Sequence, residues 1–457
     1  MNRARSTIVM PLLAVVALVL ASLLPPTGAA LAFAPIQKVT SPGGVVAWLV
    51  EDHSVPIVAL DASFAGGSAA DPTGKEGLAN LAANLLDEGA GEYDSQAYHQ
   101  RLEDRVISLE FSAGADRLQA SFRSLARDRT LAFEMLSLAL TKPRFDAEPT
   151  ERVRAQVLSE IQRARQNPRS IANRVWYSAA FPGHPYGRPG RGTSSSIDRI
   201  THDDLAQFAA ERFGRDGLIV SVVGDITPAE LAGMLDQTFG TLPAKSKPVE
   251  APPVTAAGPG GVMVVARAIP QSVVSFGQPG ILRSDPDFIP AYVLNHIVGG
   301  GGFGTRLMSE IREKRGLAYG ASSGLAAYKA TGLWMGSLAT QNGRVAQSID
   351  LVRQIWREIR EQGVTAAELN DAKTYLVGSY PLRFDSAQDI AGALLQAQED
   401  NLGADYFERR NALIEAVSLE DLSRVAKRLM DPERLVFVVV GQPAGLEPTR
   451  PVPDQPS

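Results

Sequence analysis

Hydrophobic residues recur along the chain with two periods, one typical of strands and one typical of amphipathic helices. A β-branched run over 45–50 and an alternation over 57–64 predict two early strands. Apolar residues spaced three and four apart predict a helix over 151–165 and, later in the chain, helices over 349–359 and 366–377. This order of elements predicts an α+β fold in which helices cover one face of a mostly antiparallel sheet.

One pattern, a helix followed by a strand, occurs twice. Leu205 lies in a helical segment that precedes the apolar run 218–224, and Leu422 lies in a similar segment before the run 435–441. Both runs end in glycine, and the spacing from the leucine to that glycine is the same in each copy. Short apolar runs that glycine ends are typical of buried strands. The repetition therefore predicts two homologous domains.

Proline separates the two copies. Five prolines lie between Leu242 and Gly261, and proline at this density favours an extended, semi-rigid chain. We therefore place the first domain at 33–241, a linker at 242–261, the second domain at 262–445 and a disordered, proline-rich tail at 446–457.

The first residues have the pattern of a secretory leader. Arg3 and Arg5 precede an apolar run over 8–24, and Ala30-Leu31-Ala32 is a typical cleavage site. The run also reaches the lower limit of about 17 residues for an uncleaved membrane anchor. Because prolines and a glycine break the run before the small residues, we expect a cleaved signal peptide over 1–32 and export to the bacterial periplasm.

Composition narrows the possible partners and cofactors. Hydrophobic residues make up 45% and charged residues 21% of the 457 residues, an ordinary globular balance. The net charge of −5, with no basic stripe, argues against nucleic acid as a partner. Because the chain has no cysteine, it forms no disulfides and no thiolate zinc site.

A predicted helix over 77–86 carries Asn80 and Asn84 on one face, since residues four apart share a helix face. The segment 74–86 resembles the zinc-binding helix of the insulinase-type (inverzincin) metallopeptidases, which has the pattern H-x-x-E-H. By this resemblance, Asn80 and Asn84 occupy the two histidine positions, and Ala83 occupies the position of the catalytic glutamate. The third zinc ligand of the family matches Glu160, on the helix predicted over 151–165.

These replacements remove the chemistry of the site. An amide oxygen is a weak ligand for zinc, and alanine has no group that activates water. We expect Asn80, Asn84 and Glu160 to be ordinary polar residues, hydrogen-bonded to one another in a partly buried groove; a weak calcium site is the alternative. No two histidines have H-x-x-x-H spacing that would compensate, and His184, in a loop typical of the family, is expected to be structural. The chain itself is thus expected to bind no cofactor.

The segment 299–319 resembles the carboxy-terminal half of the same family. There, an arginine and a tyrosine seven positions later reach the zinc site of the opposite domain and stabilise the oxyanion; the matching residues are Arg312 and Tyr319. Both side chains donate hydrogen bonds at neutral pH, as this role requires. Without the resemblance, Arg312 reads as one of several exposed charges and Tyr319 as a core aromatic. The residues Gly301, Gly302 and Phe303 predict a flexible loop that contacts a peptide substrate.

Two other motifs in the second half carry little weight. The glycines of 299–304 satisfy G-x-G-x-x-G, but no clear strand precedes them and no acidic residue follows at the spacing that dinucleotide binding needs. The pattern G-x-S-x-G at 320–324 places Ser322 within an apparent strand, where a nucleophile elbow does not form.

The resemblance covers nearly the whole chain after the leader and implies one half of a clamshell. Bacterial members of this half-size class pair one chain that has H-x-x-E-H with one that supplies the arginine and tyrosine. The chain has only the second set, so we expect a non-catalytic subunit of a heteromeric zinc metallopeptidase, whose homologous partner holds the zinc. A scaffold or peptide-binding protein without a peptidase partner is the alternative. A peptidase that acts alone through Glu160 and an unrecognised site is a poor third, because the chain shows no nucleophile and base.

Overall fold

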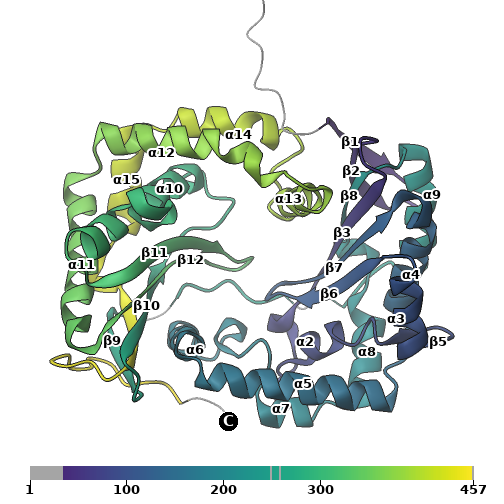
Figure 1. Cartoon of the computed structure of the whole chain (residues 1–457), viewed down its shortest axis with the longest axis horizontal. Coiled ribbons are helices and arrows are strands. Elements are labelled where there is room, and N and C mark those ends of the chain that lie inside the picture. The colour runs from purple at the N-terminus through teal and green to yellow at the C-terminus, as the bar shows by residue number, and fades with distance from the viewer. Residues whose placement is uncertain (1–33, 248–249, 257–258, 455–457) are drawn as a thin grey trace, which may run out of the picture.

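The computed structural model describes residues 34–247, 250–256 and 259–454 and consists of two halves, each built on one sheet (Figure 1). The first sheet contains, in spatial order, β1 (Ile36–Thr40), β2 (Val46–Glu51), β8 (Ile219–Gly224), β3 (Ile57–Ala65), β7 (Arg117–Leu125) and β6 (Ser108–Ala113). The second contains β11 (Ala318–Ala327), β12 (Gly332–Gln341), β10 (Gln271–Pro279), β13 (Val436–Gly441) and β9 (Gly261–Ala266). Neighbouring strands are antiparallel except for the pairs β2–β8 and β9–β13.

The two sheets repeat one topology. Strands β2, β8, β3, β7 and β6 take the same places, with the same directions of pairing, as β9, β13, β10, β12 and β11. The first sheet adds β1 at its edge, where it pairs with β2. The predicted α+β class and the two homologous, mostly antiparallel sheets are therefore confirmed.

Helices cover the outer face of each sheet. In the first half they are α2 (Leu78–Ala83), α3 (Ser95–Glu103), α4 (Arg129–Thr141), α5 (Ala147–Gln166), α7 (Ser194–Asp198), α8 (His202–Arg212) and α9 (Pro228–Phe239), with a small hairpin of β4 (Gly89–Ala90) and β5 (Tyr93–Asp94). In the second half they are α10 (Phe288–Asn295), α11 (Val345–Gln362), α12 (Ala366–Gly378), α14 (Tyr406–Glu415) and α15 (Leu419–Leu429). Each set packs on its own sheet around one large apolar core.

The inner face of each sheet is covered by a helix from the other half. Helix α6 (Pro168–Ala180) leaves the first half and packs through Val175 and Trp176 against β13, where the indole N–H of Trp176 donates to the carbonyl of Val436 at 3.2 Å. Helix α13 (Ala387–Glu399) reaches back to β3 and β8 (Figure 1). The sequence predicted helices over one face only. Burial on both faces explains why β8 and β13 are almost continuously apolar.

The described parts of the linker and of the tail both contact the second half. In the linker, Val254 donates to the carbonyl of Ala330 in the second half at 3.1 Å. The linker also contacts the first half, where the ring of His184 lies 3.0 Å from the carbonyl of Pro252. Two residues of the segment expected to be disordered, Thr449 and Arg450, donate from their backbone N–H groups to Val262 of β9. The predicted signal peptide lies outside the described residues. No helix within the described part of the chain is long and apolar enough to cross a bilayer.

Candidate functional site

The short helix α2 carries the residues at the degenerate zinc positions. Its N-terminus is held by the buried carboxylate of Asp71, which accepts from the N–H of Gly77 at 2.8 Å and from that of Ala79 at 3.0 Å. Gly77 has φ +92°, and a Cβ there would lie 2.6 Å from the carbonyl oxygen of Arg191. Only glycine fits this left-handed position beside the loop that carries Arg191.

The two asparagines differ in their side-chain hydrogen bonds. The amide nitrogen of Asn84 donates to the backbone carbonyl of Asn80 at 2.7 Å, so this side chain satisfies the end of α2 rather than pointing at a ligand. The side-chain oxygen of Asn80 is buried and has no hydrogen-bond partner among the described residues. Ala83 is buried.

Glu160, on α5, faces an arginine. A carboxylate oxygen of Glu160 lies 3.9 Å from the guanidinium of Arg191, a loose ion pair. The expected hydrogen bonds among Asn80, Asn84 and Glu160 do not form, because Asn84 turns to its own helix and Glu160 turns to Arg191. The described residues contain no cluster of three or more His, Cys, Asp or Glu placed to hold a metal ion. With one carboxylate, two amides and a guanidinium nearby, the donor set does not fit zinc or calcium.

The glycine-rich segment of the second half is helical rather than an open loop. A π-helical turn at His296–Gly300, a 3-10 turn at Gly302–Gly304 and a second π-helical turn at Met308–Glu313 follow one another. Of the residues predicted to form a flexible loop, Gly302 and Phe303 lie in the 3-10 turn, and Gly301 lies between it and the first π-helical turn. Gly316, at φ +57°, ends the last turn: its N–H donates to Arg312 and that of Leu317 to Ile311. π-Helical turns are rare and concentrate at functional sites.

Arg312 lies between two exposed aromatic rings. Its guanidinium carbon is 4.7 Å from the ring centre of Phe303 and 5.0 Å from that of Tyr319. Tyr319, at the start of β11, is 88% exposed and Phe303 is 65% exposed, so Tyr319 is not a core aromatic. Within the described residues, no carboxylate pairs with Arg312, whereas Arg315 and Lys314 on the same turn both pair with Glu310. The arrangement holds a cation in place and leaves its charge unneutralised.

The two sets of candidate residues belong to different halves of the molecule. Helix α2 lies in the first half and β11 in the second (Figure 1), and no hydrogen bond or ion pair between described residues joins Arg312 or Tyr319 to α2 or α5. Arg312 and Tyr319 are brought together with Phe303; Asn80, Ala83, Asn84 and Glu160 form the separate, degenerate group.

Sequence reasoning missed two contacts beside these groups. Arg191, in the loop after α6, pairs with Glu160 of α5, and no local sequence pattern links two residues so far apart in the chain. The ring of His296 stacks on Tyr375 of α12 at 4.9 Å, and a Cβ on Gly301 would lie 2.5 Å from the His296 ring, so a larger residue would not fit there without a shift. His184, expected to be structural, is buried between its loop and the linker.

Two family models match consecutive parts of the chain. The model described as insulinase (peptidase family M16) matches residues 46–194, and the peptidase M16 inactive domain matches residues 199–376. A crystal structure of a peptidase M16 inactive domain from Pseudomonas fluorescens has 30% sequence identity and a TM-score of 0.84, covering 92% of this chain and 100% of that one. The chain belongs to the insulinase (M16) family.

Other relatives include both a protein named as a non-peptidase and a protein named as a peptidase subunit. A non-peptidase homologue, YmxG of Helicobacter pylori, is 28% identical over 85% of this chain and 90% of its own length. A probable β subunit of the mitochondrial-processing peptidase of Schizosaccharomyces pombe is 26% identical over 85% of this chain and 87% of its own. This M16 chain thus resembles a protein named as a peptidase subunit and one named as a non-peptidase, and its own zinc positions hold Asn80, Ala83 and Asn84.

Proposed function

We propose that this M16 chain is the non-catalytic subunit of a heteromeric zinc metallopeptidase, forming half of a clamshell with a homologous partner. The partner would carry H-x-x-E-H and the zinc ion. This chain would bind part of the peptide and present Arg312 and Tyr319 to the partner's site. Its own site has neither the ligands nor the base, so we expect no hydrolysis by the chain alone.

The single observation that carries the proposal is the position of Arg312. Two exposed rings, those of Phe303 and Tyr319, hold its guanidinium at 4.7 and 5.0 Å, and no described carboxylate neutralises it. Cation–π contacts fix the side chain without consuming its five N–H donors. Aromatic residues and arginine are also enriched in the cores of protein interfaces, so their exposure together suggests a surface that another chain covers.

The chemistry suits stabilisation of a tetrahedral intermediate. Peptide hydrolysis places negative charge on the former carbonyl oxygen, and donors held ready for that charge lower the barrier. The guanidinium of Arg312 and the hydroxyl of Tyr319 are such donors. Gly301 and the turn that begins at Gly302 precede and contain Phe303, whose exposed ring lies where an extended peptide would make contact.

The test is peptidase activity of the chain with an H-x-x-E-H homologue from its source, compared with each chain alone. The Arg312→Ala change should lower kcat/KM by about 10²–10³-fold, the usual effect of removing one oxyanion donor, and Tyr319→Phe should lower it by at least about tenfold. Both variants should still assemble with the partner in size-exclusion chromatography.

A control within the same turn is Arg315→Ala, whose guanidinium pairs with Glu310 instead. It should leave activity within about threefold. Unchanged activity of Arg312→Ala in an assembled complex would exclude the proposed role. Absence of any association with such a homologue would favour the alternative, a scaffold or peptide-binding protein that works without a peptidase.

We further propose that the chain is exported to the periplasm after removal of residues 1–32. The support is the leader pattern alone. Mass spectrometry of the protein from the periplasmic fraction should find an N-terminus near Phe33. A retained leader in the membrane fraction would instead favour an uncleaved anchor.

A further inference from the structure

A cavity of about 480 Å³ lies where the two halves meet. Its walls come from the end of α5, from α6, from the loop 185–192 and, in the second half, from β9, the turn after β11 and the tail. The hydroxyl groups of Tyr177 and Tyr328, one from each half, are 2.7 Å apart and join the walls across the junction. The volume lies within the range of about 300–1,000 Å³ that is typical of ligand sites.

The charged residues that line this cavity are all basic. No aspartate or glutamate lies among the described residues that line it, and the basic lining residues are Arg165, Arg174, Arg188, Arg191 and Arg267. Arg188 is 3.9 Å from Glu76 and Arg191 is 3.9 Å from Glu160; both acids lie outside the cavity, at the outer limit of an ion pair. Arg165 and Arg267 make no ion pair within the described part of the chain.

Arg165 and Arg174 are close enough for one charge to act on the other. Burial, together with the neighbouring charge of Arg165, lowers the pKa of Arg174. The Nε–H of Arg188 is buried without a hydrogen-bond acceptor among the described residues. Like charges at close range and an unused buried donor both raise the free energy of the empty cavity, and a bound anion would relieve both.

The surfaces between the arginines are apolar. Ile161 and Ile171 line the first half, Val265 and Val452 line the second, and the rings of Tyr177 and Tyr328 lie between them. A small inorganic anion would leave these surfaces uncovered. A carboxylate borne by a side chain beside an apolar residue would use both features, because guanidinium groups bind carboxylates through paired hydrogen bonds.

We propose that this cavity binds an acidic peptide segment, in which glutamate or aspartate side chains alternate with aliphatic residues. The site adjoins the degenerate zinc position. Glu160 immediately precedes the lining residue Ile161, and Arg191 both lines the cavity and pairs with Glu160. The choice of a peptide over other anions rests on the proposed function, whereas the anion site itself does not. Arg312 and Tyr319 take no part in it.

The test is fluorescence anisotropy of the mature chain alone with a labelled peptide that contains two or three glutamates flanked by leucines. We expect saturable binding that weakens as salt increases. A peptide with glutamine in place of glutamate should bind at least about tenfold more weakly, because each arginine then loses a charge-assisted hydrogen bond. Inorganic phosphate should compete only weakly.

Variants locate the site. Arg165→Gln and Arg267→Gln, both exposed, should each weaken binding by about three- to tenfold, and their combination should weaken it further. Arg163→Gln is the matched control, because this arginine lies on the same helix, bonds to Ser159 and does not line the cavity. Binding of the acidic peptide is measured on the chain alone and peptidase activity on the complex, so failure of the subunit role and failure of the peptide site give different results.

Equal affinity for the glutamate and glutamine peptides, or unchanged binding by the double variant, would overturn the proposal. Tight binding of phosphate that displaces the peptide completely would overturn the assignment to a peptide.

Discussion

At the degenerate zinc positions of the first half, the side chains contact neighbouring protein groups. Asn84 satisfies the carbonyl of Asn80, and Arg191 provides the positive charge opposite Glu160. The loss of the zinc ligands could be predicted from the sequence, because ligand identity follows from residue type at a helical spacing. The pairing of Glu160 with Arg191 could not, because it depends on how a distant loop folds over α2.

At this scale the buried carboxylate of Asp71 gives the clearest prediction. It accepts two backbone hydrogen bonds at the start of α2, from Gly77 and Ala79. The Asp71→Ala change leaves both donors buried without a partner, so we expect a loss of about 1–3 kcal/mol in the free energy of unfolding, measured by urea denaturation. The control is Asp203→Ala, because the side chain of Asp203 is fully exposed. Equal stability of the two variants would contradict the capping role.

Between elements, the contact of α13 with β3 contains an acid that is costly to ionise. Asp61 is buried, accepts from Gln388 at 2.8 Å and lies near the carboxylate of Glu399, which pairs with Arg117 at 3.0 Å. Burial raises the pKa of Asp61 to about 6. Because the folded state then holds this proton more tightly than the unfolded state, the contribution of Asp61 to stability is greatest below about pH 4 and falls as pH rises through 6.

The Asp61→Asn variant should remove this dependence. The amide still accepts from Gln388 but carries no charge, so we expect a gain of about 2–3 kcal/mol at pH 8 and almost no change at pH 4. Thermal or urea unfolding at several pH values measures it, with exposed Asp350→Asn as the control. A gain that is the same at both pH values would show that ionisation of Asp61 is not the cause.

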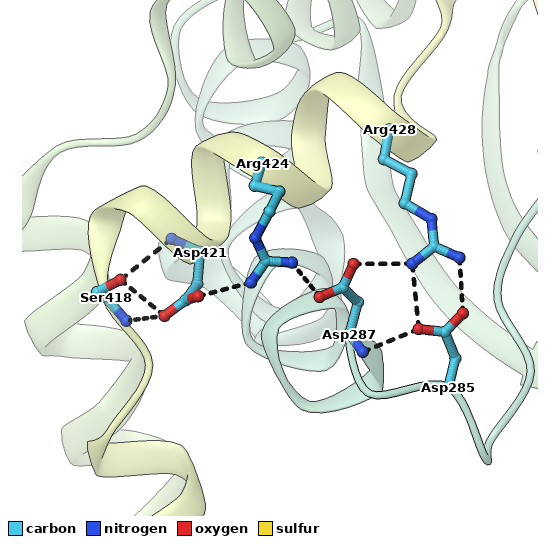
Figure 2. A network of polar contacts seen from close by, with 6 residues as sticks. All are labelled: Asp285, Asp287, Ser418, Asp421, Arg424 and Arg428. Carbon is cyan, nitrogen blue, oxygen red and sulfur yellow. Dashed lines mark hydrogen bonds and ion pairs between the residues drawn. The ribbon is translucent and has the colours of Figure 1, made fainter.

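A second contact between elements ties α15 to the turn before α10 (Figure 2). Arg428 binds Asp285 through both terminal nitrogens, at 2.6 and 3.1 Å, and Asp287 at 2.7 Å; Arg424 joins Asp287 to Asp421. The hydrogen bond from Arg428 lowers the pKa of Asp285. Because these side chains are partly exposed, the network is expected to contribute modestly.

A double-mutant cycle of Arg428→Ala and Asp285→Ala should give a coupling energy of about 0.5–1 kcal/mol, which falls as salt rises to about 1 M. The matched pair is Arg357 and Glu433, at 3.5 Å and more exposed, for which we expect a value near zero. Equal coupling in the two pairs would mean that the bidentate geometry adds nothing.

At the scale of the whole molecule, the sequence did not predict that α6 and α13 are exchanged, each covering the inner face of the sheet in the other half. Periodicity predicted some of the helices and strands, because local spacing reports which face of an element is apolar, but it predicted neither α6 nor α13. The apolar runs of β8 and β13 also indicated burial, yet they could not show which helix lies on their second face. Residues 168–180 follow α5 directly in the chain, while Trp176 contacts β13, more than half the chain away. That assignment needs tertiary structure.

This exchange predicts that the two halves unfold together. Trp176 is buried against β13, and a Cβ on Gly277 of β10 would lie 2.8 Å from its ring, so the fit is close from both sides. Trp176→Ala should lower the free energy of unfolding by about 3–5 kcal/mol, whereas Leu382→Ala, at an exposed position, should change it by less than about 0.5 kcal/mol. Circular dichroism and limited proteolysis in urea should report one coincident transition for the wild type. Two separate transitions, of which Trp176→Ala shifted only one, would mean that each half is stable without the helix that it receives from the other.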